Sequence, residues 1–122
     1  MIIAPGRMTH RAVEAMRTAF LEDEVSCVML VPSRLYPFDV GPLLPTLAGA
    51  AQIVVAEESV AGGTWGSEIA QSIHSRLWGR LSRPVRLVHS ADSIIPTAPH
   101  LERTVLVQES TIRAVLKEVA GA

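Results

Sequence analysis

The sequence has little of several residue types on which particular protein classes depend. Its single cysteine, Cys27, excludes an internal disulfide, and no Cys/His cluster at zinc-ligand spacing accompanies it. Aromatic residues make up only 4% of the chain. Lys117 is the one lysine among 11 basic residues, so any local basic surface favours the planar, bidentate contacts of arginine. The net charge of −1 argues against nucleic-acid or anionic-membrane binding driven by overall charge.

Long hydrophobic runs are also lacking. The apolar run at 53–56 is far too short to span a bilayer, and the N-terminal residues do not resemble an export signal. We therefore expect a cytoplasmic protein without membrane insertion. The 122 residues, 48% hydrophobic and 19% charged, are typical of a globular protein that buries roughly two thirds of its unfolded surface. We expect residues 1–122 to form a single domain.

Short apolar runs alternate along the chain with segments of helical periodicity. This alternation is typical of an α/β fold in which a parallel sheet is covered on both faces. Each run is too apolar for a half-solvated strand, so all four strands are predicted to be central or nearly so. The predicted strands are residues 1–4, 25–31, 52–56 and 84–88.

Helical spacing predicts four helices between and after these strands. The first follows Gly6, buries its face at Met8, Ala12, Ala15, Met16 and Ala19, and is expected to fray at the acidic residues 22–24. The second is expected to start near Pro42, with Asp39 as a candidate cap, and to be kinked at Pro45. The others cover 62–78, with Gly79 as a stop, and 112–119, with Ser110 or Thr111 as cap and Gly121 as terminator.

Residues 92–102 contain two prolines, which predict an ordered crossing segment without regular structure. Its side chains Ile94, Ile95 and Leu101 are expected to be buried.

Three glycines, Gly62, Gly63 and Gly66, follow a predicted strand and open a predicted helix. Free backbone donors at such a place can cradle a phosphate. The order G-G-x-x-G is not that of a dinucleotide fingerprint, no Lys-Ser/Thr pair follows, and Trp65 fills the middle. The pattern favours a tight helix entry against a neighbouring subunit.

Glu57 and Glu58 lie where the third predicted strand ends. Paired carboxylates can divide acid and base roles, but adjacent strand residues point to opposite faces. Unless the strand has already ended, the two side chains cannot share a substrate, and strand-end hydrogen bonding or an interface salt bridge is favoured.

Other reactive residues give weak patterns. His89, Ser90 and Asp92 bring a hydroxyl, an imidazole and a carboxylate near one strand end, but no G-x-S-x-G elbow is present, so a hydrolase is the least favoured function. The spacing of the histidines argues against a metal site. They are His10, His74, His89 and His100.

The remaining candidates have structural interpretations. Cys27 falls in a predicted buried strand and is interpreted as a small core side chain. Trp65 and Trp78, thirteen residues apart on one predicted helix, are interpreted as packing or interface residues.

Three segments occur in a recognisable order: Arg34-Leu-Tyr-Pro-Phe-Asp39, then residues 57–69, then residues 92–102. Together they resemble the transketolase C-terminal domain. More closely, they resemble the C-terminal domain of the beta chain of thiamine-dependent 2-oxo acid dehydrogenases, the decarboxylating component of the pyruvate and branched-chain complexes. Residues 1–8 are similar to that domain's first parallel strand and the turn that follows it, and residues 84–88 resemble a later strand, so the resemblance covers nearly the whole chain.

The resemblance implies a three-layer α/β/α sandwich with a mostly parallel sheet of about four strands, without the antiparallel strand that precedes them in the family. It implies that thiamine diphosphate and magnesium are bound by other domains and that this chain holds no catalytic, cofactor-binding or metal-binding residue. The implied partners are a thiamine-binding domain or subunit, a second copy of the chain and the acyltransferase core. The interface candidates are Gly62, Gly63, Trp65, Gly66, Glu57 and Glu58.

Two functions follow from this reading. The first is a non-catalytic C-terminal domain or split subunit of a thiamine diphosphate-dependent 2-oxo acid dehydrogenase or transketolase-like enzyme, with exposed apolar surface for association. An upstream domain of comparable size does not fit within 122 residues, so the sequence is expected to be an excised domain, a natural split subunit or a module of a larger assembly. The alternative is a stand-alone small-anion or nucleotide-binding module, with Arg34 as the anion-binding candidate beside residues 62–66 and Arg86.

Overall fold

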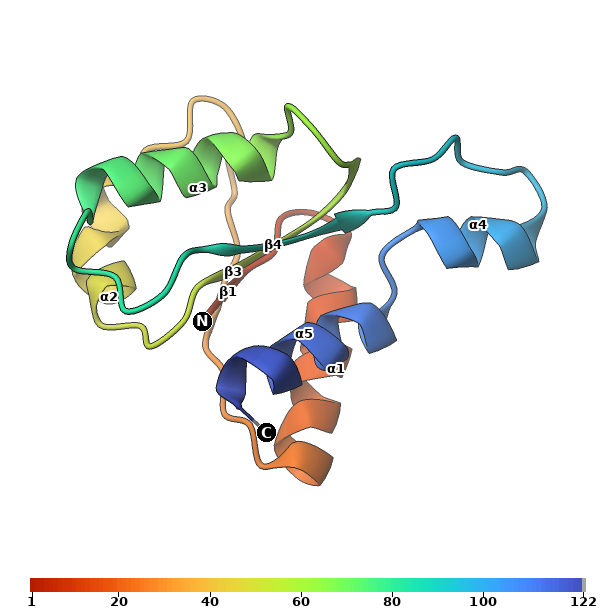
Figure 1. Cartoon of the computed structure of the whole chain (residues 1–122), viewed down its shortest axis with the longest axis horizontal. Helices are drawn as coiled ribbons and strands as arrows, with labels where there is room; N and C mark the ends of the chain where they lie inside the picture. The colour runs from red at the N-terminus through yellow and green to blue at the C-terminus, as the bar shows by residue number, and fades with distance from the viewer. Residues whose placement is uncertain (122) are drawn as a thin grey trace.

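The computed structural model describes residues 1–121, in which four parallel strands form one sheet (Figure 1). The strand order is β2-β1-β3-β4, and Ile2 of β1 pairs with Met29 on one side and Val54 on the other. The prediction of a parallel sheet of about four strands is confirmed. The strands are β1 (Ile2–Ile3), β2 (Met29–Leu30), β3 (Val54–Val60) and β4 (Arg86–Ser90).

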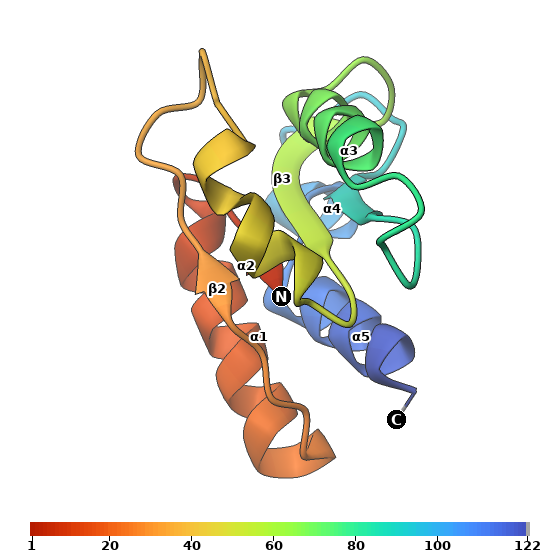
Figure 2. The same ribbon diagram turned by 90° about the vertical axis from the view of Figure 1, so that its left-hand side faces the viewer.

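Helices cover both faces of the sheet, so the fold is the expected three-layer α/β/α sandwich (Figure 2). The helices α1 (Met8–Asp23) and α5 (Glu109–Ala120) pack on one face, in a core cluster that includes Ile2 and Ile112. On the other face, Ile3 and Ile73 belong to a second cluster beneath α3 (Trp65–Arg76) and the short helices η1 (Gly41–Leu43) and α2 (Leu44–Ala48). The neighbouring residues Ile2 and Ile3 therefore point to opposite faces of the sheet and pack in different core clusters.

The faces of α1 and α3 that the sequence periodicity predicts to be buried are turned towards the sheet. In α1 the predicted face is buried, apart from the partly buried Met16, and α3 buries Ile69, Ala70 and Ile73, with Leu77 buried just after its end. That helix ends at Arg76, earlier than predicted, and leaves Trp78 86% exposed. Gly121 ends α5 in the left-handed conformation, as expected. Its cap is Gln108, however, whose backbone N–H donates to Thr111.

The prediction that every strand is central or nearly so is wrong for β2 and β4, which form the two edges of the sheet. Only Met29 and Leu30 of the predicted second strand are β structure, while Val28 and Val31 are exposed. An edge strand has one neighbour and less cover, so its apolar residues need not be buried. Cys27 lies outside a regular strand, partly buried against the cluster beneath α1 and α5.

The prediction for residues 92–102 is also wrong, because helix α4 (Pro99–Val105) starts there. Pro99 occupies the first helical turn, where a missing N–H breaks no intrahelical bond. The expected burial fails as well: Ile94 is 90% exposed, and Ile95 and Leu101 are about half exposed. The second predicted helix does form beside Pro42 and Pro45, as η1 and α2, and Asp39 accepts a hydrogen bond from Gly41 N–H at its start.

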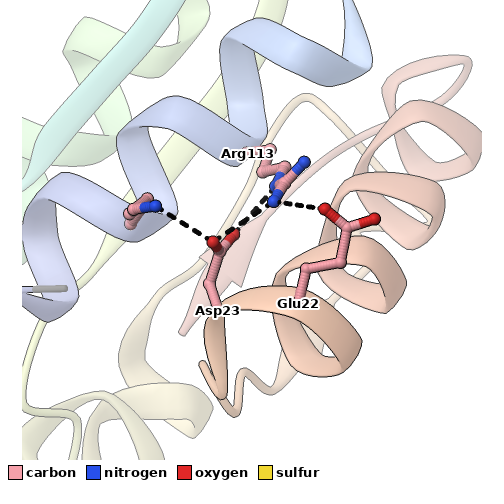
Figure 3. Close-up of polar contacts among 4 residues, drawn as sticks. Glu22, Asp23 and Arg113 are labelled. Carbon is pink, nitrogen blue, oxygen red and sulfur yellow. Dashed lines mark hydrogen bonds and ion pairs between the residues drawn. The ribbon is translucent and has the colours of Figure 1, made fainter.

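The acidic end of α1 is helical through Asp23, and basic side chains of α5 pair with it (Figure 3). Asp23 accepts hydrogen bonds from Arg113 Nε at 2.8 Å and from Lys117 Nζ at 3.1 Å, and Glu22 lies 2.7 Å from Arg113. The hydrogen bonds from Arg113 and then Lys117 lower the pKa of Asp23 from 3.8 to about 2. These ion pairs offset the unfavourable interaction with the helix dipole.

Asp23→Asn is expected to lower the melting temperature at neutral pH by several degrees, because the charge-assisted bonds between α1 and α5 are lost. A lowered folded-state pKa means that this stabilisation is complete above pH 3.8 and disappears as the pH falls towards 2. Thermal unfolding across pH should therefore show the two proteins converging in acid. Glu22→Gln, at a more exposed position, is the control and should change the melting temperature less. A constant difference at every pH would contradict this assignment.

Candidate functional site at the carboxyl edge of the sheet

The loops after β2, β3 and β4 all leave the sheet at the edge where the parallel strands end (Figures 1 and 2). Ligands and functional residues of open α/β sheets gather at this edge. The residues predicted to matter, Arg34, Glu57, Glu58 and residues 62–66, lie on the first two of these loops or on β3. The structure therefore brings most of the candidates to one side of the molecule.

Glu57 is the central polar residue of this edge. Its side chain is buried, with Oε1 accepting from Gly66 N–H at 3.0 Å and Oε2 accepting from Ser59 Oγ–H at 3.1 Å. Thr64 caps the same helix by accepting from Ser67 N–H at 3.2 Å. Because a carboxylate already occupies the N-terminal end of α3, the proposed phosphate cradle there is filled by the chain itself.

The glycine pattern has a local explanation. Gly62 and Gly63 have positive φ angles of 91° and 55°, which β-carbon-bearing residues rarely adopt, and they form the turn from β3 into α3. Gly66 serves a different purpose, because a Cβ there would lie 2.5 Å from Glu57 Oε1 and 3.2 Å from Val55 Cγ1. The spacing thus combines a turn with a close approach between helix and strand.

The two adjacent glutamates do not form a catalytic pair. Glu57 is enclosed by the start of α3, whereas Glu58 is partly exposed and its carbonyl accepts from Ser90 Oγ–H at 2.7 Å. That bond joins β3 to β4 where their register shifts, between Ala56 and Val60. The arrangement agrees with the strand-end hydrogen bonding inferred from the sequence.

Trp65 fixes the loop after β2. Its indole N–H donates to Leu35 O at 2.8 Å, and its ring meets Phe38 edge to face at a centroid distance of 5.6 Å. Tyr36 remains 81% exposed on this anchored loop, and Arg34 is exposed beside it. Trp78 lies at the other end of α3, so the two tryptophans do not act together.

The Ser90 hydroxyl and the His89 imidazole do not form a hydrogen-bonded catalytic pair. Ser90 Oγ donates to Glu58 O, while His89 Nδ1 contacts Ser90 O, so the hydroxyl is not paired with the imidazole. His74 Nε2 accepts from Val85 N–H and supports the start of β4. Within residues 1–121 no three His, Cys, Asp or Glu side chains are grouped so that they could hold a metal ion.

Across residues 1–121, no helix combines the length and the apolar character needed to cross a bilayer.

Two curated proteins are similar in sequence to this chain. The mitochondrial 2-oxoisovalerate dehydrogenase subunit beta of Dictyostelium discoideum is 24% identical over 95 residues, which cover 78% of this chain and 26% of that protein. The pyruvate dehydrogenase E1 component subunit beta of Rickettsia felis is 24% identical over 97 residues, which cover 80% of this chain and 30% of that protein. The chain therefore spans less than a third of the length of these relatives.

A solved structure has the same fold. It is described as a split gene transketolase, inactive beta4 tetramer, and it superposes with a TM-score of 0.75 at 20% identity, covering 98% of this chain and 38% of that one. The family model for the transketolase C-terminal domain matches residues 1–112. With this match over most of its length, the chain belongs to the transketolase C-terminal domain family.

Proposed function

We propose that this chain is a non-catalytic domain or split subunit of a thiamine diphosphate-dependent enzyme of the 2-oxo acid dehydrogenase or transketolase type, and that it serves subunit assembly. In this proposal residues 1–122 act as one domain. Thiamine diphosphate and magnesium are bound by a partner chain, which also carries the catalytic residues. The observation that supports the proposal is a set of exposed apolar side chains on the elements at the carboxyl edge of the sheet.

This surface, the apolar rim, consists of large apolar side chains that are 37% to 90% exposed. They lie at the end of β3, on the loops after β2 and β4, and on α4. Large apolar side chains are also exposed elsewhere on the chain, at Val13, Phe20, Leu21, Val28 and Trp78. Large exposed apolar surface at one edge is typical of a site that associates with another protein. The rim residues are Leu35, Tyr36, Val60, Ile94, Ile95 and Leu101.

The interface candidates from the sequence have two roles in this proposal. Gly62, Gly63 and Trp65 lie beside the apolar rim and contact the partner, as does the partly exposed Glu58. Glu57 and Gly66 bind each other inside the chain and hold the loop in shape. A loop that is already fixed loses less entropy when it binds, which favours association.

The proposed partners are a thiamine-binding chain, a second copy of this chain and an acyltransferase core. The names of the relatives support association, because two are beta subunits and the solved structure is a beta4 tetramer. Protein interfaces typically combine an apolar centre with a polar surround, so the exposed apolar side chains and the polar residues near them can contact the same partner.

The alternative of a small-anion or nucleotide-binding module built on Arg34, residues 62–66 and Arg86 has less support. Arg86 begins β4, at the edge opposite to Arg34, and pairs with Glu118 at 3.3 Å. The start of α3 is occupied by Glu57. The three parts of that hypothetical site are therefore not brought together.

Affinity capture from the source organism tests the proposed assembly role. The tagged chain should recover a protein that contains thiamine diphosphate, identified by mass spectrometry and by a cofactor assay of the eluate. A chain that stays monomeric and recovers no thiamine-binding protein would contradict the proposal.

A further inference from the structure

A small polar cavity of about 230 Å³ lies between the start of α1 and the connection from α4 to α5. Arg7 and Arg11 line it from the α1 side, Arg103 lines it from α4, and Gln108 lines it from the cap of α5. These residues come from opposite ends of the sequence, and only the packing of α5 on α1 and β4 brings them together.

The arginines of this cavity carry uncompensated charge. None of the ion pairs formed among residues 1–121 includes Arg7, Arg11 or Arg103. Glu102 contributes a carboxylate to the lining, so three positive charges and one negative charge leave a net charge of +2. Arg76, Arg86 and Arg113 each pair with a carboxylate, whereas Arg17, Arg34, Arg80 and Arg83 are, like the cavity arginines, in none of these pairs. What distinguishes the cavity is that three arginines line it together.

Arg11 is held in position before any ligand binds. Its guanidinium donates to Val107 O, which ties it to the segment between α4 and α5. A guanidinium has further N–H donors, and these remain for a ligand in the cavity. A donor that is already ordered costs less entropy on binding.

The cavity also lies where this topology favours a ligand. From β1 the chain passes to β2 on one side of it and then crosses to β3 on the other side. The direction in which strands are added to the sheet therefore reverses between β1 and β3. In open α/β sheets, ligands bind outside the carboxyl ends of the strands at this point. Arg7 belongs to the turn that leaves β1 there.

We propose that Arg7, Arg11 and Arg103 form a binding site for a phosphate group carried by a small molecule. The planar fork of arginine matches the oxygens of phosphate, and a doubly charged phosphate balances the net charge of the lining. The volume is below the roughly 300–1,000 Å³ of pockets for drug-sized ligands, so the site fits a small phosphate ester better than a nucleotide. The site is independent of the proposed assembly role.

The test is a titration of the full chain, labelled with ¹⁵N, with inorganic phosphate and with glycerol phosphate at constant ionic strength. Saturable shifts are expected at the amides of Arg7, Arg11 and Gln108. Arg7→Gln and Arg103→Gln should each weaken phosphate binding about tenfold, the loss expected for one charge-assisted hydrogen bond. Arg17→Gln, on α1 but outside the lining, is the matched control and should bind as the unmodified chain does.

Each outcome bears on the site directly. Binding of both probes with loss in the two variants supports it, and tighter binding of the ester identifies a phosphorylated small molecule as the ligand. Absence of saturable shifts with either probe overturns the proposal, as does equal weakening by Arg17→Gln. A third titration, with an acidic peptide, tests a protein ligand: shifts with the peptide but not with phosphate would also overturn the proposal. Circular dichroism confirms that each variant is folded.

Discussion

Gly66→Ala is expected to lower the free energy of unfolding by about 1–3 kcal/mol, the usual cost of overpacking a well-filled interior. The added Cβ would lie 2.5 Å from Glu57 Oε1 and 3.1 Å from Glu57 Cδ. Relief of that contact requires the carboxylate to move away from the N–H of residue 66, which breaks its hydrogen bond. Chemical denaturation of the purified chain measures the loss.

Gly49→Ala is the matched control. A Cβ at this position meets its nearest neighbour at 3.7 Å, and the φ angle of −83° is one that alanine adopts freely. This variant should be neutral or slightly more stable, because glycine loses more backbone entropy on folding. In a helix interior alanine is also favoured over glycine by about 1 kcal/mol, so a destabilised Gly66→Ala protein cannot be explained by helix propensity. Equal stability of the two variants would contradict the contact with Glu57.

Tyr36→Asp and Ile94→Asp are expected to weaken association with the thiamine-binding partner about a hundredfold, as substitutions of well-buried interface anchors do. Both side chains belong to the apolar rim and are more than 80% exposed, so neither is needed for the core. The melting temperature of the isolated chain should therefore stay within a few degrees. Binding is measured by surface plasmon resonance against the captured partner.

Leu21→Asp supplies the control for a charge placed on an exposed apolar residue. Leu21 is 68% exposed, but it lies in the last turn of α1, away from the carboxyl edge of the sheet. The Leu21→Asp variant should bind the proposed partner as tightly as the unmodified chain does. If Leu21→Asp weakens binding as much as the rim variants do, the apolar rim is not the contact surface.

The fold was predictable from the sequence wherever a periodic pattern fixed which side chains face inward. The spacing of Ala12, Ala15 and Ala19, or of Ile69 and Ile73, is enough to place α1 and α3 on the sheet. The order of the strands was not predictable in this way. Composition does not distinguish an edge strand from a central one, which is why the burial of Val28 and Val31 was overestimated.

Local capping chemistry was also harder to predict. Pro99 starts α4 instead of interrupting it, because proline disrupts the interior of a helix and not its first turn. At the end of α1, repulsion between acidic residues and the helix dipole was expected to cause fraying. The arginine and lysine of α5 that reverse this effect lie about 90 residues away, at positions 113 and 117.

The candidate site was partly predictable. The chemistry at the end of β3 follows from sequence order, since a strand, a glycine turn and a helix come in succession. The contact of Glu57 with Gly66 across nine residues, and its exclusion of a phosphate at that place, required the structure. The apolar rim was not predicted from the sequence, because hydrophobic residues such as Ile94 and Ile95 are normally expected to be buried.

Reconstitution of activity tests the central claim most directly. Thiamine-dependent decarboxylation of 2-oxo acids is measured for the captured thiamine-binding partner alone, for this chain alone and for the mixture. The assembly role predicts that this chain alone is inactive and that the mixture is more active than the partner alone, with Tyr36→Asp and Ile94→Asp abolishing the gain. Activity of this chain by itself, or a mixture no more active than the partner, would contradict it.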